Sequence, residues 1–549
     1  MKKRYTWSSK AYRRLLELVG LFAVLVAVVV VQPTTRTQAQ SSDAPASAAT
    51  RIAPTGKLTV GKAVLRTWAQ ITAAESTLAP LAPAAEVPFR STLGDAAYKA
   101  AKAAANSVPR SVKPRAPEPL GPLGPPVFKG ISIEGVNQSE TPPFFRPPDT
   151  HGAIGTSHFV EITNTHLDIY SRDGIRVAST SLAAFFGYST EAIFDPRAVY
   201  DPIWNRWVIT GDAFPESSTV QKFLVAISKT SDPTSQYYRY IINANFFSIS
   251  NDFFDFPQLG FDQDAVIITA NIFGSTSSFK GARLFAVAKA RLYNGLSFSV
   301  PRYDGLVGTL APPIVLDQNQ NAFLVAAPAF LSPGGSTVTK YTFTNASNAF
   351  GATLSSSPIT VPTYSIPPDA PQPTGGTCSS TANLLDTSDA RFVNASTQIG
   401  SSLFQVHTVA LGSFAVPKFY EFNTSTNTVV QSGFFFANGS SFDWNASIAA
   451  TTAKNVFVTW TSDLATSTTA PQVRFSGRLA ADPAGAIGAG FTLFNSPLIC
   501  YDPSTDPVER WGDYSAVTID PLSSLRAWVV NEKINDGTTW GSRIGNIGY

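Results

Sequence analysis

The sequence is poor in charged residues, methionine, histidine and cysteine. Only 14% of its 549 residues are Asp, Glu, Lys or Arg, and it holds one methionine, four histidines and two cysteines. Helical bundles and coiled coils need many charged residues on their solvent faces, so this composition argues against both. So few histidines and so little methionine also argue against a multi-histidine or thioether metal centre.

Several motifs of common enzyme sites are missing as well. The sequence has no G-x-S-x-G nucleophile elbow, no phosphate-binding P-loop, no H-E-x-x-H and no C-x-x-C. Its two cysteines are Cys378 and Cys500. In an exported protein such a pair favours a disulfide. Two unpaired thiols are the alternative, because spacing proves nothing about geometry.

The first forty residues predict export. Six basic side chains precede an uncharged apolar run from Leu18 to Val31, and Thr37-Gln38-Ala39 then places small residues where a signal peptidase reads them. The run is short for a membrane span of about 20 residues. We therefore expect a signal peptide over 1–39 and a secreted or cell-envelope protein. An uncleaved membrane anchor over residues 15–31 is the alternative.

Charge and composition change along the rest of the chain. Residues 126–549 hold 24 Lys and Arg against 32 Asp and Glu, a net charge of −8. A mildly acidic globular part disfavours nucleic acid as a partner. Residues 40–125 are rich in Ala, Pro, Ser and Thr, with weak helical stretches at Leu58–Ala74 and Ala96–Ala105. We expect a low-complexity stalk there, disordered or partly helical.

The sequence is rich in turn formers and aromatic residues, with 40 Pro, 37 Gly, 38 Phe, 17 Tyr and 9 Trp. From Val127 onward, short apolar runs alternate with Gly, Pro, Asn, Asp and Ser, which is typical of strands joined by turns. One layout recurs: a leading Asp, an apolar strand, a polar turn and a second apolar strand. The leading positions are Asp149, Asp195, Asp255, a position near 312 without the Asp, Asp389, Asp443 and Asp513.

This recurrence predicts an all-β fold over 126–549, a seven-bladed β-propeller with six or eight blades as alternatives. One four-stranded sheet cannot bury both of its faces alone, whereas sheets stacked around a ring cover one another. We expect the strand Val127–Ile133 to close the ring beside the last blade. An array of β-sandwiches is the structural alternative, although it would not by itself explain the recurring Asp.

Some of the repeated segments are distinctive. FDPRAVYDPIWNRWVIT, SKTSDP, the SDAR stretch at Ser388–Arg391 and RWGDYSAVTIDP resemble a group of exported bacterial propeller-like proteins. The resemblance covers about residues 140–549 and rests on the order and spacing of these motifs. It implies the same fold and export. It implies little about function, because members of that group mostly lack an assigned activity.

The leading residues are also the candidate site. If each repeat begins its innermost strand at the leading Asp, the carboxylates form a broken ring at one mouth of the central channel. Such a ring can bind Ca²⁺, a sugar or a charged ligand; alternatively, each Asp accepts backbone hydrogen bonds and only fixes a turn. The ligand-binding candidates are Asp149, His151, Asp195, Arg197, Asp255, Asp389, Arg391, Asp443 and Asp513.

No catalytic residue stands out and no cofactor is required. We therefore expect a non-enzymatic propeller that binds a glycan, a small molecule or a protein at the channel mouth or the blade loops. A carbohydrate-active hydrolase or lyase, with sialidase-like propeller chemistry, is the second hypothesis, since two channel-mouth carboxylates could serve as its acid and base. A third is a surface structural protein, tethered to the membrane only if the N-terminal segment stays uncleaved.

Overall fold

The computed structural model describes residues 49–78, 86–87, 89–110, 128–142, 144–214, 221–243, 252–274, 278–328, 335–372, 384–464 and 470–549. All of them lie in one compact unit, Ser47–Tyr549. The predicted signal peptide lies outside the described residues, and so does Cys378. Cys500 is buried, and its pairing with Cys378 stays a prediction. No helix among the described residues is both long and apolar enough to cross a membrane.

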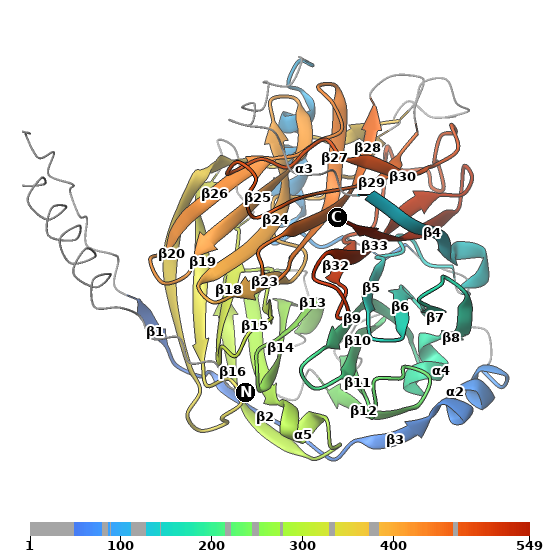
Figure 1. Cartoon of the computed structure of the whole chain (residues 1–549), viewed down its shortest axis with the longest axis vertical. Coiled ribbons are helices and arrows are strands. Elements are labelled where there is room, and N and C mark those ends of the chain that lie inside the picture. The colour runs from blue at the N-terminus through green and yellow to red at the C-terminus, as the bar shows by residue number, and fades with distance from the viewer. Residues whose placement is uncertain are drawn as a thin grey trace, which may run out of the picture. The chain divides into compact units, whose positions relative to one another are not determined.

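The chain is all-β, as predicted, and its strands form antiparallel meanders that follow one another in sequence (Figure 1). The first meanders are β5 (His151–Ile154), β6 (His158–Thr163), β7 (His166–Ser171) and β8 (Arg176–Ser181), then β9 (Ala192–Asp201), β10 (Arg206–Phe214), β11 (Lys222–Ser228) and β12 (Gln236–Asn243). Next come β13 (Phe253–Phe261), β14 (Ala265–Phe273), β15 (Phe279–Ala288) and β16 (Phe298–Leu306), then β17 (Pro313–Val315), β18 (Asn321–Ala326), β19 (Gly335–Thr344) and β20 (Thr353–Tyr364). The remaining ones are β23 (Ser396–Ile399), β24 (Ser402–Leu411), β25 (Phe414–Asn423) and β26 (Thr428–Phe434), then β27 (Ser441–Ala450), β28 (Val456–Leu464), β29 (Gln472–Arg478) and β30 (Phe491–Asn495), and last β32 (Ala516–Ile519), β33 (Arg526–Ile534), β34 (Trp540–Gly548) and β4 (Phe128–Asn137).

The first strands of these meanders contact one another in a closed series. The order is β5, β9, β13, β17, β23, β27, β32 and β5 again. The short strand β17 even pairs in parallel with both β13 and β23. The meanders therefore stand around a common axis as the sheets of a propeller-like fold.

The hydrophobic core lies between neighbouring sheets. One apolar cluster joins β6 and β7 to β9 and β10 around the fully buried Trp207. Another joins β28 and β29 to β32 and β33. Because successive side chains of a strand point to opposite faces, a sheet covered on both faces reads as a nearly continuous apolar run. The buried stretch Ala265–Phe273 of β14 is such a run.

The ring closes between strands from opposite ends of the chain. β4 pairs antiparallel with β34, so that Asn137 lies opposite Gly541 and Phe128 opposite Gly548. This confirms the predicted closing strand, which extends four residues beyond Ile133. A sheet shared by both ends leaves no open gap in the ring.

Residues 49–78 form three strands and a helix in place of the predicted low-complexity stalk. β1 (Thr50–Ile52), β2 (Gly56–Val60) and β3 (Val64–Thr67) add to the outer edge strands β20, β16 and β12. α2 (Trp68–Glu75) then packs against α4 (Leu182–Phe186) and β8. The prediction was wrong here because a sheet edge offers unpaired backbone groups to any strand that reaches it. We call residues 49–78 the strap.

The remaining elements are short. α3 (Asp95–Asn106) matches the helix predicted over Ala96–Ala105, whereas the helix predicted over Leu58–Ala74 begins only at Trp68. The others are η1 (Gln138–Glu140), α5 (Lys289–Leu292) and a small sheet of β21 (Ala370–Pro371), β22 (Leu384–Leu385) and β31 (Val508–Glu509). In this sheet β22 runs parallel to β31, which brings the residues that follow each strand together near the ring axis.

Candidate functional site

Most of the predicted site residues gather at one end of the ring axis. The Asp513 amide donates to Oδ1 of Asp149 at 2.7 Å, and the Phe256 amide donates to Oδ2 of Asp195 at 3.1 Å. Nε of Arg391 donates to both carboxylate oxygens of Asp389 at 2.7 Å. We call this group the acidic cluster; its members are Asp149, Asp195, Asp255, Asp389 and Asp513.

Asp443 does not join the acidic cluster. Its carboxylate accepts hydrogen bonds from Nε1 of Trp460 at 2.9 Å and from the Ala437 amide at 3.0 Å, so it ties β27 to β28. In four of the repeats a positive φ occurs at the leading Asp or within two residues after it, at Asp149, Asp195, Phe256 and Asn445.

Register shifts in the strand pairing explain why repeats that match at their leading Asp in sequence do not match there in space. The pairing slips between Asp255 and Gln258 and between Trp444 and Ser447, which is the mark of a β-bulge. The residue with positive φ lies within each shift, one position after Asp255 and two after Asp443. Asp and Asn tolerate this conformation best, and Asp149 and Asp195 are the leading residues that occupy it.

Burial governs the electrostatics of the acidic cluster. Desolvation, and then the charge of Asp513, raises the pKa of Asp149 to about 7. Desolvation and then Asp149 raise the pKa of Asp195 well above its ordinary value. The guanidinium of Arg510 lies 2.9 Å from the carboxylate of Asp513. The cluster is thus a buried network of carboxyl groups and guanidinium groups.

Residues 86–87 and 89–110 cover this end of the axis, so the predicted channel mouth is closed there. Arg90 pairs with Asp255 at 3.2 Å, and the ring of Phe89 lies 5.5 Å from the guanidinium of Arg391. On α3, Lys102 pairs with Asp369 at 2.5 Å. No composition signal pointed to this contact.

Arg197 lies across the axis and forms the floor between two compartments. Its guanidinium donates to the backbone oxygens of Pro257 and Val393 and to Oδ1 of Asn394 at 3.0–3.1 Å. It also stacks on the ring of Tyr514, 3.4 Å from the ring centre. With 1% of its surface exposed, Arg197 fastens the inner strands of several sheets to one another.

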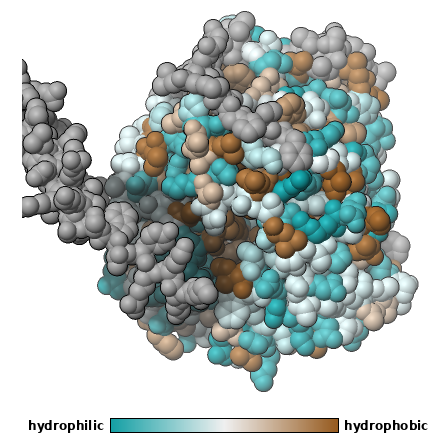
Figure 2. All heavy atoms as spheres, viewed as in Figure 1, coloured by the Kyte–Doolittle hydropathy of each residue, from teal (hydrophilic) through white to brown (hydrophobic). Residues whose placement is uncertain are grey.

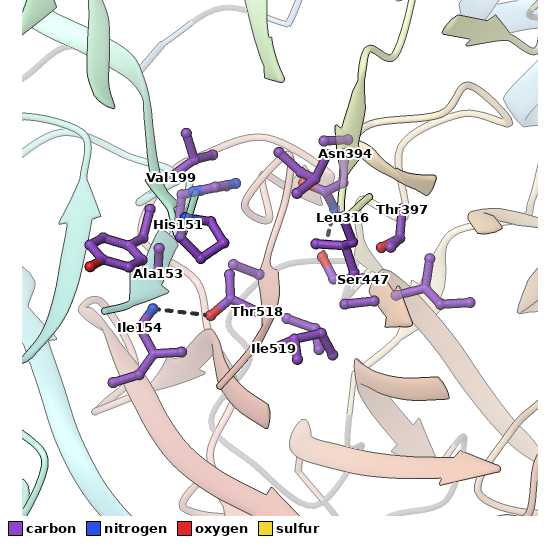
Figure 3. Close-up of a pocket in the computed structure, with 18 of the residues that line it drawn as sticks. His151, Ala153, Ile154, Val199, Leu316, Asn394, Thr397, Ser447, Thr518 and Ile519 are labelled. Carbon is purple, nitrogen blue, oxygen red and sulfur yellow. Dashed lines mark hydrogen bonds between the residues drawn. The ribbon is translucent and has the colours of Figure 1, made fainter. Parts of the chain in front are cut away.

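A cavity of about 140 Å³ lies on the other side of this floor. The inner strands β5, β9, β17, β23, β27 and β32 or their adjoining residues supply its walls (Figure 3). Most of the lining is aliphatic, as in Ile154, Val199 and Leu316, and no charged side chain belongs to the lining that the structure describes. Figure 2 shows hydrophobic residues in a hollow near the centre of this face. We call the 140 Å³ cavity the channel cavity.

His151 is the only predicted site residue that lines the channel cavity among those described. Asn394, Ser447 and Ser515 line it as well, and they form a chain of hydrogen bonds from Asn394 to Ser447 at 2.7 Å and from Ser515 to Ser447 at 3.0 Å. Sequence reasoning missed these residues, because small polar and aliphatic side chains on strands carry no chemical signature.

No metal site is visible in the ranges that the structure describes. Within them, no three His, Cys, Asp or Glu side chains come together as ligands for an ion. The Ca²⁺ prediction therefore has no residue set to support it, and it stays a prediction.

The chain was compared with known proteins. No protein-family model matches it, and no curated protein matches it. Among solved structures it is similar to the Dos1 propeller, with 6% identity and a TM-score of 0.33 over 71% of this chain and 75% of that one. It is also similar to a protein of unknown function from Dyadobacter fermentans, with 10% identity and a TM-score of 0.34 over 77% and 99% of the two chains. A third similar structure is the WD40 domain of SCAP from fission yeast, with 10% identity and a TM-score of 0.30 over 76% and 98%. Likenesses at this level carry no argument about function.

Proposed function

We propose that this chain is an exported, non-enzymatic, seven-bladed β-propeller that binds a small, largely apolar ligand in the channel cavity. Seven inner strands follow one another around the axis, and six of them begin a run of four paired strands. The seventh, β17, pairs with β13 and β23, and the paired strands β18, β19 and β20 follow it in the sequence. The basic residues and apolar run of the first forty residues support export.

The character of the channel cavity is the observation that carries the proposal. An apolar cavity of about 150 Å³ engineered into another protein binds benzene, and the channel cavity has about 140 Å³. Without a charged residue in its described lining, it offers no partner to a desolvated ionic ligand. A glycan would need many more polar groups than these walls supply. An aromatic or branched aliphatic group suits the lining best.

The acidic cluster is better suited to holding the hub together than to catalysis. Asp149 and Asp195 accept hydrogen bonds from backbone amides of neighbouring sheets, and Asp389 is paired with Arg391. Residues 86–87 and 89–110 cover the cluster. These contacts favour a structural role for the aspartates over the general acid and base of a hydrolase.

Binding of ethylbenzene to the full chain tests the proposal by titration calorimetry. We expect saturable binding to the unmodified protein and a loss of at least tenfold in affinity for Leu316→Trp, because the indole would fill the cavity. Leu498→Trp is the matched control, since Leu498 is 54% exposed and lies outside the cavity lining. Absence of binding, or equal binding by both variants, would contradict the proposed function.

A further inference from the structure

His151 presents a hydrogen-bond donor that the protein does not use. Its Nδ1 accepts the Ala198 amide at 3.3 Å. Burial, and then the charge of Arg197, lowers the pKa of His151 well below its ordinary value. The ring is therefore neutral, and its one hydrogen sits on Nε2. Nε2 has no hydrogen-bond partner among the described residues.

Two threonines on other inner strands add further donors. Thr518 of β32 accepts the Ile154 amide at 3.2 Å, and Thr397 of β23 accepts the Ala450 amide at 3.3 Å. Each hydroxyl uses a lone pair in this contact and keeps its hydrogen. Within the described ranges, neither hydrogen meets an acceptor. Both threonines line the channel cavity together with His151 (Figure 3).

The other polar groups of the lining are already engaged. Ser447 donates to the Ser515 backbone oxygen at 2.8 Å. The single hydrogen of Ser515 Oγ has two acceptors within reach, the Asn445 backbone oxygen at 2.9 Å and Ser447 Oγ at 3.0 Å. Oδ1 of Asn394 accepts from Arg197 at 3.0 Å.

The guanidinium of Arg197 lies in the floor and is not part of the described lining. The hydrogens left for a ligand are those of His151 Nε2 and of the Thr518 and Thr397 hydroxyls, and each hydroxyl also keeps one lone pair. A ligand with a hydrogen-bond acceptor satisfies these hydrogens, and one with only donors does not.

We propose that the channel cavity selects a compact apolar molecule that carries a neutral acceptor oxygen, such as the carbonyl oxygen of an aromatic ketone or aldehyde. This inference rests on the proposed function and names the ligand class of the same cavity. A carboxylate is disfavoured, because its full charge would lose hydration without a cationic partner in the lining. A carbonyl oxygen brings two lone pairs and no charge.

Matched probes of one shape test the inference. Acetophenone, ethylbenzene and benzylamine each carry a short substituent on one phenyl ring: the first brings a neutral acceptor, the second no polar group, and the third, which is protonated at neutral pH, a cation with donors only. Titration calorimetry on the full chain compares their affinities. We expect acetophenone to bind about tenfold more tightly than ethylbenzene, which is the usual effect of one to two net hydrogen bonds. Benzylamine should bind least.

Variants then assign the preference to its donors. Thr518→Val, Thr397→Val and His151→Phe each remove one donor, and we expect each to reduce the ratio of acetophenone to ethylbenzene affinity several-fold. Thr428→Val, on the exposed outer strand β26, is the control and should leave the ratio unchanged. A thermal melt confirms that each variant is folded.

The outcomes separate the two proposals. If ethylbenzene binds as tightly as acetophenone, or benzylamine binds best, and Leu316→Trp still blocks binding, the acceptor preference is wrong while the binding function stands. If none of the probes binds, the proposed function itself is wrong and the ligand class falls with it. A preference for acetophenone that survives all three donor variants also overturns the inference.

Discussion

At the scale of single residues, buried polar groups hold the ring together where sheets meet. Glu161 on β6 is the clearest case: one carboxylate oxygen accepts the Val136 amide of β4 at 3.0 Å, and the other contacts Oγ of Ser542 on β34. Ser542 in turn donates to the Val136 backbone oxygen at 3.2 Å. If Glu161 is protonated and donates to Ser542, each donor in this series of hydrogen bonds has an acceptor.

The protonation of the buried Glu161 carboxyl group predicts that stability depends on pH. Burial raises its pKa to about 8, with Asp168 adding to the rise. Since the folded pKa lies above the unfolded one, the stabilisation is present below about pH 4.5 and is lost as the pH rises through about 8. We expect the free energy of unfolding to fall by roughly 4–5 kcal/mol across this window through Glu161.

Urea unfolding between pH 5 and 8.5 measures this loss. Glu161→Gln keeps the hydrogen bonds of the protonated acid but cannot ionise, so its stability should vary less with pH than that of the unmodified protein. Glu134→Gln, a half-exposed carboxylate on β4, is the control and should keep the original slope. An unchanged slope in Glu161→Gln would show that another group titrates.

At the scale of elements, the N-terminal segment matters more than its composition suggests. In β2 the residues alternate between exposed and buried, with Leu58 and Val60 turned inward. Its partner β16 lies about 240 residues later in the sequence. Local composition could not reveal this pairing, because the stabilisation comes from a distant sheet edge and from no feature of the segment itself. The helix α3 was easier to foresee, since its run of alanines favours a helix anywhere.

Lys102 is the anchor of α3, and its removal should detach the helix. Its ammonium group donates to the backbone oxygens of Pro367 and Ser388 and to the Thr387 hydroxyl, at 3.0–3.1 Å. Lys102→Ala would leave the buried Asp369 without its cation, which typically costs about 3–5 kcal/mol.

Limited trypsin digestion and urea unfolding check the role of Lys102. We expect faster cleavage within 86–110 and a lower midpoint for Lys102→Ala. Lys99→Ala, on the exposed side of the same helix, should behave like the unmodified protein. Equal behaviour of the two variants would mean that Lys102 does not hold α3 in place.

At the scale of the whole molecule, closure depends on both ends of the chain. A chain that stops at Asn535 lacks β34, so β33 and β4 lose the strand between them. We expect this truncated chain to lose the single cooperative unfolding transition in urea, followed by far-UV circular dichroism. Phe350→Ala, at a side chain that is 95% exposed, should leave the transition unchanged. A truncated chain with the original midpoint would show that closure contributes little.

The ring and its closing strand could be predicted because their signals are local. Alternating apolar runs and turn residues repeat along the sequence, and Val127–Ile133 is one such run left over near the N-terminal end. The acidic cluster could be predicted only in part. A bulge adds a residue without disturbing the apolar pattern, so Asp443 aligned with Asp149 in sequence but not in space. The channel cavity could not be predicted, because a hollow is defined by what distant strands leave unfilled.

The pairing of β4 with β34 has a consequence for biosynthesis. Asn137 and Gly541 lie opposite each other, yet a ribosome adding about 5–20 residues per second needs on the order of tens of seconds to travel from one to the other. Throughout that interval β4 has been made but lacks β34, whereas β12, β16 and β20, the partners of the strap, are made earlier. Among these strands β4 thus waits longest for its partner, and its edge must be kept from pairing with anything else until β34 has been made.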